Sequence, residues 1–280
     1  MQNRIQHVPL SSGFSMPQFG LGTWQLTGRD CTSAVQQAVG LGYTHIDTAE
    51  MYGNHREVGE GIKESGAKRE DLFITSKIWR ENLRPKDVIR SAEQGLADLQ
   101  LDYLDLLLIH WPHDSVPLGE TFGAFGDLVD RKKVRSIGVS NFTRRRLGEA
   151  IEVSPKPVTV NQIECHPYLK QEKMLDYSET RNVVITAYSP LARGKALQDD
   201  TVVSVAGEKG KEPAQIILRW QIQRGVVIIP KASSEKHLKS NIGIFGWELS
   251  ENEMRRIDRI GVEVHRRLID PGFTDFREDD

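Results

Sequence analysis

Four residues in the first 110 positions of this chain could together transfer a proton. Asp47, Lys77 and His110 each follow a short strand-like segment, and Tyr52 lies on the turn after Asp47. A charged aspartate at the end of a buried strand costs free energy unless it is paired, and Lys77 is its natural counter-ion. A lysine and a histidine near a tyrosine lower the phenol's pKa from its reference value of about 10. We therefore expect Tyr52 to be a usable general acid near neutral pH.

A structural interpretation of these residues has to be weighed against the catalytic one. A single buried histidine is more often a satisfied core residue than a catalytic one, and a single buried Asp–Lys pair is more often structural. The joint occurrence of these groups at successive strand ends, with a tyrosine on the same turn as Asp47, favours catalysis.

The elements that must position these residues alternate between strand and helix along the chain. Residues 5–8 are expected to form one arm of an N-terminal β-hairpin, and residues 18–21 are expected to form the first strand of the repeat. The other expected strands are residues 44–46, 72–75, 104–109, 137–139, 158–160, 183–187 and 226–229. The expected helices are residues 29–39, 54–64, 85–99, 118–129, 143–153, 171–177, 201–208, 213–223, 234–241 and 250–260, with Asn54 available to cap the second.

The strand pattern predicts an α/β protein with a closed barrel. Runs such as residues 106–109 and 226–229 are continuously apolar, as in parallel strands covered by helices on both faces. The 280 residues fit one (β/α)8 TIM barrel, which typically needs about 250, with an N-terminal β-hairpin and extra helices. We expect residues 1–280 to form a single domain. An open doubly wound sheet is the alternative, but the turn at residues 20–25 lacks the third glycine of the dinucleotide fingerprint.

Composition excludes several other classes of function. The chain is 38% hydrophobic and 27% charged, which is typical of a globular protein. Its net charge is −2, so it lacks the excess of basic residues that would indicate a nucleic-acid partner. The N-terminus lacks a secretory apolar region, and no apolar run reaches the roughly 18 residues that span a membrane. Cys31 and Cys165 form neither a disulfide scaffold nor a metal-ligand cluster. These features predict a cytoplasmic protein without a metal site.

In a barrel of this kind the active site lies at the carboxyl ends of the strands. Besides the four residues above, these ends carry Trp24, Ser140, Asn141, Gln162, Tyr188 and Lys231. Neighbouring strands lie about 4.8 Å apart, so their end residues can converge. Trp24, Trp79 and Trp111 also fall at or just past strand ends, and aromatic walls around a few polar groups suit a small carbonyl substrate.

Seven sequence blocks, in matching order, resemble the aldo-keto reductase family. They are residues 42–54 (GYTHIDTAEMYGN), 74–79, 107–112 (LLIHWP), 138–142, 160–168 (VNQIECHPY), 187–194 and 229–233. The likeness runs from about residue 10 to residue 260, and the short polar tail is similar to that of compact microbial members such as diketogluconate and methylglyoxal reductases.

The resemblance implies NAD(P)H-dependent reduction of small aldehydes or ketones. Tyr52 would protonate the carbonyl oxygen while the nicotinamide delivers hydride, with Asp47 and Lys77 tuning Tyr52 and His110 orienting the substrate. The implied substrate-binding residues are Tyr52, His110, Trp24, Trp79 and Trp111. Tail residues 265–276 would supply further substrate contacts.

The same resemblance implies a set of cofactor-binding residues. They are Thr23, Trp24, Asp47, Ser140, Asn141, Gln162, Tyr188, Ser189, Leu191, Lys231, Ser233, His237 and Asn241. Members that prefer NADPH usually have serine and arginine at the positions of Ala232 and His237, and histidine lacks arginine's two-pronged donor set for phosphate. Because Lys231 is kept, we expect NADPH as the cofactor, with NADH possible.

Two other functions stay open from the sequence. A non-catalytic NADPH-binding regulatory protein with this fold would not need all of Asp47, Tyr52, Lys77 and His110. A barrel hydrolase or isomerase would need a metal cluster or a carboxylate pair at the strand ends, and neither is visible in the sequence. As in most relatives with this architecture, we expect a monomer, with a small carbonyl compound as its partner and no nucleic acid or membrane.

Overall fold

Eight parallel strands make up the central sheet of the protein, whose computed structural model describes residues 5–276. In the sheet their order is β10-β9-β8-β7-β6-β5-β4-β3, so that each strand pairs with its neighbour in sequence. The strands are β3 (Leu21–Gly22), β4 (His45–Asp47), β5 (Phe73–Ile78), β6 (Leu104–Ile109), β7 (Val134–Ser140), β8 (Val158–Glu164), β9 (Val184–Tyr188) and β10 (Val227–Ile228).

Short contacts between the first and last strands close the sheet into a barrel. Phe19 forms a parallel bridge with Ile228, and the Gly20 N–H donates to the Ile228 carbonyl at 2.9 Å. Further along, the Gly22 N–H donates to the Pro230 carbonyl at 3.2 Å. The predicted (β/α)8 barrel is therefore confirmed, and the open doubly wound sheet is wrong for this chain.

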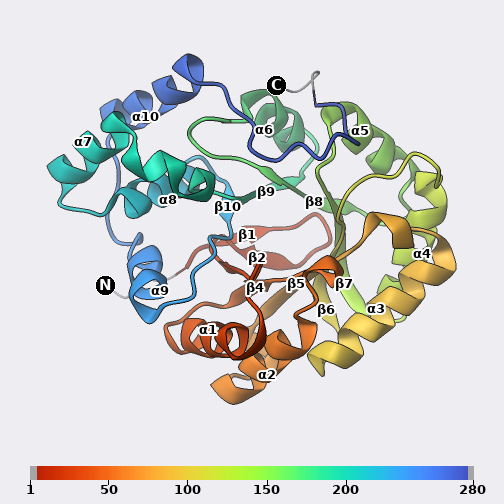
Figure 1. Ribbon diagram of the computed structural model, residues 1–280. Helices are drawn as coiled ribbons and strands as arrows, with labels where there is room; N and C mark the ends of the chain where they lie inside the picture. The colour runs from red at the N-terminus through yellow and green to blue at the C-terminus, as the bar shows by residue number, and fades with distance from the viewer. Residues whose placement is uncertain (1–4, 277–280) are drawn as a thin grey trace.

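Helices surround the ring of strands, as Figure 1 shows. They are α1 (Gly28–Gly40), α2 (His55–Ser65), α3 (Pro85–Leu99), α4 (Leu118–Asp130), α5 (Arg144–Val153), α6 (Glu172–Glu179), α7 (Asp200–Lys209), α8 (Pro213–Gln223), α9 (Glu235–Ile242) and α10 (Glu251–Glu263). Most predicted helix ends agree to within two residues, and α10 runs three residues further than expected. Apolar side chains between helices and strands, such as Val35, Val88 and Leu107, form the main core.

The N-terminal hairpin consists of β1 (His7–Pro9) and β2 (Ser15–Pro17), which pair antiparallel. It lies across the centre of the ring of strands in Figure 1. Leu10 and Met16 pack with Phe73 and Val227, residues at the amino ends of their strands. The hairpin therefore covers the end of the barrel opposite to the carboxyl ends where the predicted site lies.

Two further sequence expectations concern thiols and membranes. Cys31 and Cys165 are buried free thiols, which confirms that they form no disulfide. Among residues 5–276 no helix is both long and apolar enough to cross a membrane. The cytoplasmic location stays a prediction.

Barrel closure at Gly22 can be tested with an alanine. A Cβ atom there would lie 2.6 Å from the Ile229 carbonyl oxygen, so backbone must shift. We expect Gly22→Ala to lower the free energy of unfolding by about 1–3 kcal/mol, the usual range for overpacking. Gly40→Ala is the matched control, because its Cβ would meet nothing within 4 Å and alanine favours the helix. Urea unfolding measures the stability of both variants. If Gly22→Ala were as stable as Gly40→Ala, the close approach of Gly22 to the Ile229 carbonyl would be contradicted.

Candidate active site

A sealed ion pair lies at the carboxyl ends of β4 and β5. The Lys77 ammonium donates to Asp47 Oδ1 at 2.5 Å and to the Thr48 carbonyl oxygen at 2.9 Å. The Lys77 and Asp47 side chains are 0% and 1% exposed. Gln162 Nε2, which comes from β8 on the far side of the barrel, donates to Asp47 Oδ2 at 2.7 Å. Both carboxylate oxygens of Asp47 are thus satisfied without water.

The hydroxyl of Tyr52 lies beside this pair. Lys77 Nζ is 3.3 Å from the Tyr52 oxygen and 4.9 Å from its ring centroid. Tyr52 ends the short 3-10 helix η1 (Glu50–Tyr52), which follows β4 directly. Its ring contacts Trp24 and His110, with centroids 4.9 and 5.6 Å away. The structure thereby brings together the four residues that the sequence singled out.

Burial dominates the electrostatics of the ion pair. It raises the pKa of the Asp47 carboxyl and lowers the pKa of the Lys77 ammonium, and the opposite charge of each partner counteracts part of the other's shift. Removing either partner would leave an uncompensated charge in the barrel.

The expected lowering of the Tyr52 pKa is wrong in this structure. Burial, followed by the Asp47 carboxylate charge, raises the pKa of Tyr52 well above its usual value. Although Tyr52 is partly exposed and lines the cavity described below, burial is the larger cause of this shift. Its phenol is therefore protonated at neutral pH, which suits a proton donor. Burial and the Lys77 charge lower the pKa of His110 well below its usual value, so its imidazole is neutral.

Asn141 connects three strand ends by hydrogen bonds. Its side-chain nitrogen donates to the His110 carbonyl at 2.9 Å and to Ser140 Oγ at 3.0 Å, and its oxygen accepts from the Tyr188 hydroxyl at 2.7 Å. Asn141 has a φ of +62°, a left-handed conformation that asparagine tolerates better than most residues. This network fixes Tyr188 against the ends of β6 and β7.

A cavity of about 470 Å³ opens at this end of the barrel. Its lining includes most of the predicted site residues: Trp24, Asp47, Tyr52, His110, Trp111, Asn141, Gln162, Tyr188, Ser189, Leu191 and Lys231. Seven others lie outside the lining, among them Trp79. Lys77 is fully buried. The Thr23 hydroxyl donates to the Asp47 carbonyl, and the Ser140 hydroxyl donates to the Gln162 carbonyl. Asn241 is buried in α9, whereas Ser233 and His237 are exposed near the start of that helix.

Trp79 also lies outside the cavity lining, although it contacts a residue that forms it. Its ring centroid is 5.2 Å from that of His110. Trp111 contacts the C-terminal segment, with centroids 5.2 Å from Phe273 and 6.2 Å from Phe276. The tail, which reads as polar in sequence, therefore presents aromatic rings beside the cavity.

Sequence reasoning missed three cavity residues, Gln25, Met51 and Arg193, whereas Ile269 lies within the tail segment expected to contact the substrate. Gln25 and Arg193 have φ values of +64° and +53°, and Ser189, Ala192 and Gly194 also have positive φ. Such conformations are uncommon and often mark functional loops. The glycine at 194 was the available signal in the sequence for Arg193, whereas nothing in the sequence distinguished Met51 as a cavity residue.

Glu164, at the end of β8, holds the C-terminal segment in place. Its side chain is fully buried, and its carboxylate accepts from the backbone N–H groups of Leu268 at 2.7 Å and Ile269 at 2.9 Å. His166 Nε2 lies 2.8 Å from the same carboxylate. The hydrogen bonds from Leu268 and Ile269 to Glu164 hold the C-terminal segment where Ile269 lines the cavity.

Asn54 precedes α2 as predicted but does not cap it with its side chain. Its amide nitrogen donates to the carbonyls of Thr23 and Leu26, each at 2.9 Å, and its oxygen accepts from the Thr48 hydroxyl at 2.8 Å. The capping prediction is wrong because the side chain joins the loops after β3 and β4 instead.

Residues 18–262 match the model of the Aldo/keto reductase family, and the chain belongs to that family of oxidoreductases. It is 42% identical to glyoxal reductase from Bacillus subtilis (strain 168), covering 91% of this chain and 93% of that protein. Identity to aldo-keto reductase family 1 member A1-A from Danio rerio is 39%, over 90% and 88% of the two chains. A solved structure of a provisionally assigned 2,5-diketo-D-gluconic acid reductase B superposes with a TM-score of 0.93 at 36% identity, over 98% and 97%. The expected family and its compact microbial type are confirmed.

Neutralising Asp47 tests the buried ion pair. We expect Asp47→Asn to lower the free energy of unfolding by about 3 kcal/mol at pH 7, because Lys77 stays buried without its counter-charge. The pKa of Lys77 then falls further below its unfolded value of about 10.4, so the unfolded state binds more protons. Stability of the variant, relative to wild type, should therefore recover as pH rises from 7 towards 10.

The matched control is Asp98→Asn, which removes a partner of Arg56 from an ion pair at the surface. The free energy of unfolding of Asp98→Asn should stay close to that of wild type at every pH from 7 to 10, because exposed ion pairs contribute little to stability. Urea titrations at several pH values measure both variants. A pH-independent loss in Asp47→Asn would contradict the assigned charge state of the pair.

Proposed function

We propose that this protein reduces small aldehydes and ketones to alcohols with NADPH, and that Tyr52 donates the proton. The observation that carries this proposal is that Tyr52 lines the cavity while its hydroxyl lies 3.3 Å from the ammonium of Lys77, which is itself fully buried and paired with Asp47. A protonated phenol there can hydrogen-bond to a carbonyl oxygen and then give up its proton. The non-catalytic alternative offers no reason for the sealed pair behind Tyr52.

Each residue has a separate task in this mechanism. When Tyr52 loses its proton, the phenolate lies next to the Lys77 ammonium, which stabilises the new negative charge. Asp47 holds Lys77 in place from behind. His110, neutral, directs a ring N–H towards the carbonyl oxygen and orients the substrate. A nicotinamide held beside Asn141, Gln162 and Tyr188 would supply the hydride, and the rings of Trp24 and Trp111 would form apolar walls around the substrate.

The residues around the cavity suit a nicotinamide dinucleotide. Asn141 and Gln162 offer amide groups at the inner end, and the Tyr188 ring, fixed through its hydroxyl, offers a flat face for stacking. Lys231 lines the cavity at the end of β10 and is exposed. Beyond it, Ser233 and His237 lie near the amino end of α9, where backbone N–H groups and the helix dipole favour phosphate. We expect NADH to be accepted as an alternative cofactor, because His237 stands where family members that prefer NADPH usually have arginine.

Support for a small substrate comes from relatives and from the tail. Glyoxal reductase bears a small carbonyl compound in its name. The segment held by Glu164 narrows the cavity with Ile269, next to the Trp111–Phe273 contact. We expect methylglyoxal and small aromatic aldehydes to be reduced, and we expect the protein to act as a monomer.

Removing the Tyr52 hydroxyl tests the proposed acid. We expect Tyr52→Phe to lower kcat for aldehyde reduction by at least about a hundredfold, within the usual contribution of general acid catalysis. NADPH binding, measured by fluorescence titration, should change little. Tyr103→Phe, at the start of β6 on the opposite end of the barrel, is the control and should keep wild-type activity. A fully active Tyr52→Phe enzyme would remove Tyr52 from the acid role.

Introducing an arginine at position 237 tests the proposed binding site for the 2′-phosphate of NADPH. We expect His237→Arg to raise the ratio of kcat/KM with NADPH to kcat/KM with NADH by about tenfold, because a charge-assisted contact to the 2′-phosphate contributes about 1.5 kcal/mol or more. Val262→Arg adds the same charge on an exposed face of α10 and should leave the ratio unchanged. An unchanged ratio in His237→Arg would refute this assignment.

A further inference from the structure

Glu50, at the start of η1, accepts three hydrogen bonds from two neighbouring elements. Its Oε2 accepts from the Trp79 backbone N–H at 2.8 Å. Its Oε1 accepts from Asn82 Nδ2 at 2.7 Å and from Ser91 Oγ at 2.9 Å. Asn82 ends the 3-10 helix η3 (Arg80–Asn82), and Ser91 lies on α3. One part-buried carboxylate thus ties the turn after β4 to the whole connection after β5.

These bonds form a second link between two segments that carry the proposed chemistry. The first link runs from Lys77 to Asp47 and to the Thr48 carbonyl, at the strand ends. The second runs from Trp79, two residues beyond Lys77, to Glu50, two residues before Tyr52. Tyr52 and Trp79 both contact the His110 ring, with centroids 5.6 and 5.2 Å away. The proton donor, the histidine and the tryptophan are therefore held in one arrangement from both sides.

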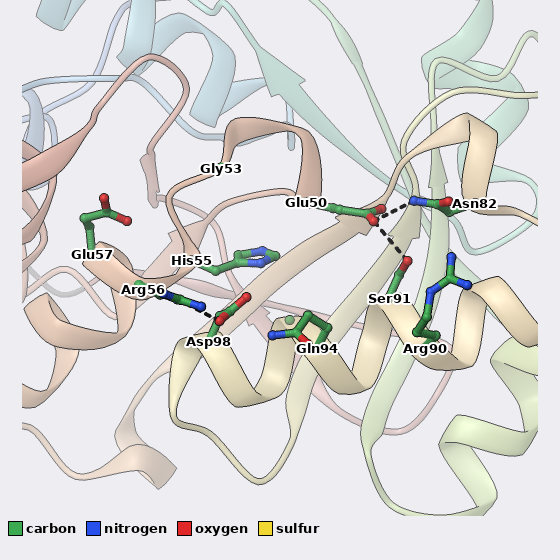
Figure 2. A pocket seen from close by; sticks show the side chains of 11 residues that line it. Glu50, Gly53, His55, Arg56, Glu57, Asn82, Arg90, Ser91, Gln94 and Asp98 are labelled. Carbon is green, nitrogen blue, oxygen red and sulfur yellow. Dashed lines mark hydrogen bonds and ion pairs between the residues drawn. The ribbon is translucent and has the colours of Figure 1, made fainter.

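A groove of about 600 Å³ gives access to this carboxylate from outside the barrel. Figure 2 shows the Glu50 side chain directed at Asn82 and Ser91, with the Arg56–Asp98 ion pair at the other end of the groove. Asn82 and the buried Ser91 line this groove together with Glu50, so water that enters it can replace the carboxylate as their hydrogen-bond acceptor when Glu50 is truncated. A change in catalysis can therefore be separated from a loss of folding.

We propose that Glu50 is a positioning residue for the carbonyl-reducing site. By holding the Trp79 backbone to η1, it sets the position of the Trp79 ring relative to the Tyr52 hydroxyl and the His110 ring. Its effect on catalysis is indirect, since Glu50 is not among the residues that line the active-site cavity. This inference rests on the proposed function, in which His110 and Tyr52 meet the substrate carbonyl.

Both side-chain oxygens of Glu50 act as acceptors: Oε2 for the Trp79 N–H, and Oε1 for Asn82 and Ser91. Glutamine keeps one oxygen for the Trp79 N–H, while the amide of Asn82 and the hydroxyl of Ser91 can rotate to accept from the new NH2 group. Alanine removes the acceptor for all three donors. The two substitutions should therefore differ sharply in their effect, whereas a role of the negative charge alone would make them equal.

The test compares Glu50→Ala, Glu50→Gln and a matched control, Glu57→Ala, at a glutamate on α2 that lines the same groove. We expect Glu50→Ala to lower kcat/KM for an aromatic aldehyde by about tenfold or more, in line with the cost of small misplacements at a reacting centre. The Kd for NADPH and the midpoint of urea unfolding should change little. Glu50→Gln should recover most of the lost activity, and Glu57→Ala should match wild type.

Two results would overturn the proposal. One is a folded Glu50→Ala enzyme with wild-type kcat/KM, and the other is an equal loss in Glu50→Ala and Glu50→Gln. If Glu50→Ala does not fold, the double variant Asn82→Ala/Ser91→Ala leaves only the Trp79 bond to Glu50. An intermediate loss of kcat/KM is then expected, and wild-type activity would refute the role.

The two proposals fail in different ways. If Tyr52→Phe is inactive while Glu50→Ala behaves like Glu57→Ala, the proposed reduction stands and the positioning role falls. If Tyr52→Phe is fully active, the proposed mechanism itself is wrong, whatever the Glu50 variants do.

Discussion

The buried Lys77–Asp47 pair is the constraint on which the site depends. Two opposite charges without exposure are tolerated only because every strong hydrogen-bonding position around them is filled, by Thr48, Gln162 and the Tyr52 hydroxyl. Gln162 reaches Asp47 from β8, across the barrel. Any opening of the ring would separate these groups, so barrel closure at β3 and β10 and the charge pair support each other.

Two tiers of interactions surround the cavity. The inner tier consists of the ion pair, Tyr52 and the Asn141–Tyr188 network at the strand ends. The outer tier consists of buried or part-buried carboxylates that accept backbone N–H groups: Glu50 for Trp79, and Glu164 for Leu268 and Ile269. Carboxylates suit this task because each accepts several donors at once. They fix connecting segments, which lack the regular hydrogen bonds of the barrel, on the two sides of the cavity.

Sequence reasoning went wrong where a side chain had more than one possible partner. Local spacing made Asn54 a helix cap, but the approach of the Thr23 and Thr48 loops gave it stronger partners. Proximity to Lys77 and His110 suggested a lowered Tyr52 pKa, but burial and the Asp47 charge act the other way, and the neutral His110 contributes no positive charge. Both errors came from long-range surroundings that spacing along the chain does not encode.

The sequence by itself determined the barrel, nearly all helix spans and the strand-end residues, because apolar periodicity and the order of strands and helices are local properties that survive in one dimension. It also identified Asp47, Tyr52, Lys77 and His110, since parallel strands bring their carboxyl ends to one edge. Only the tertiary structure decided which of the other residues reach the cavity. Met51, Arg193 and Ile269 lie on turns and a tail whose course is set by contacts such as those of Glu50 and Glu164. Those contacts join residues up to 105 positions apart, and no pattern along the chain fixes them.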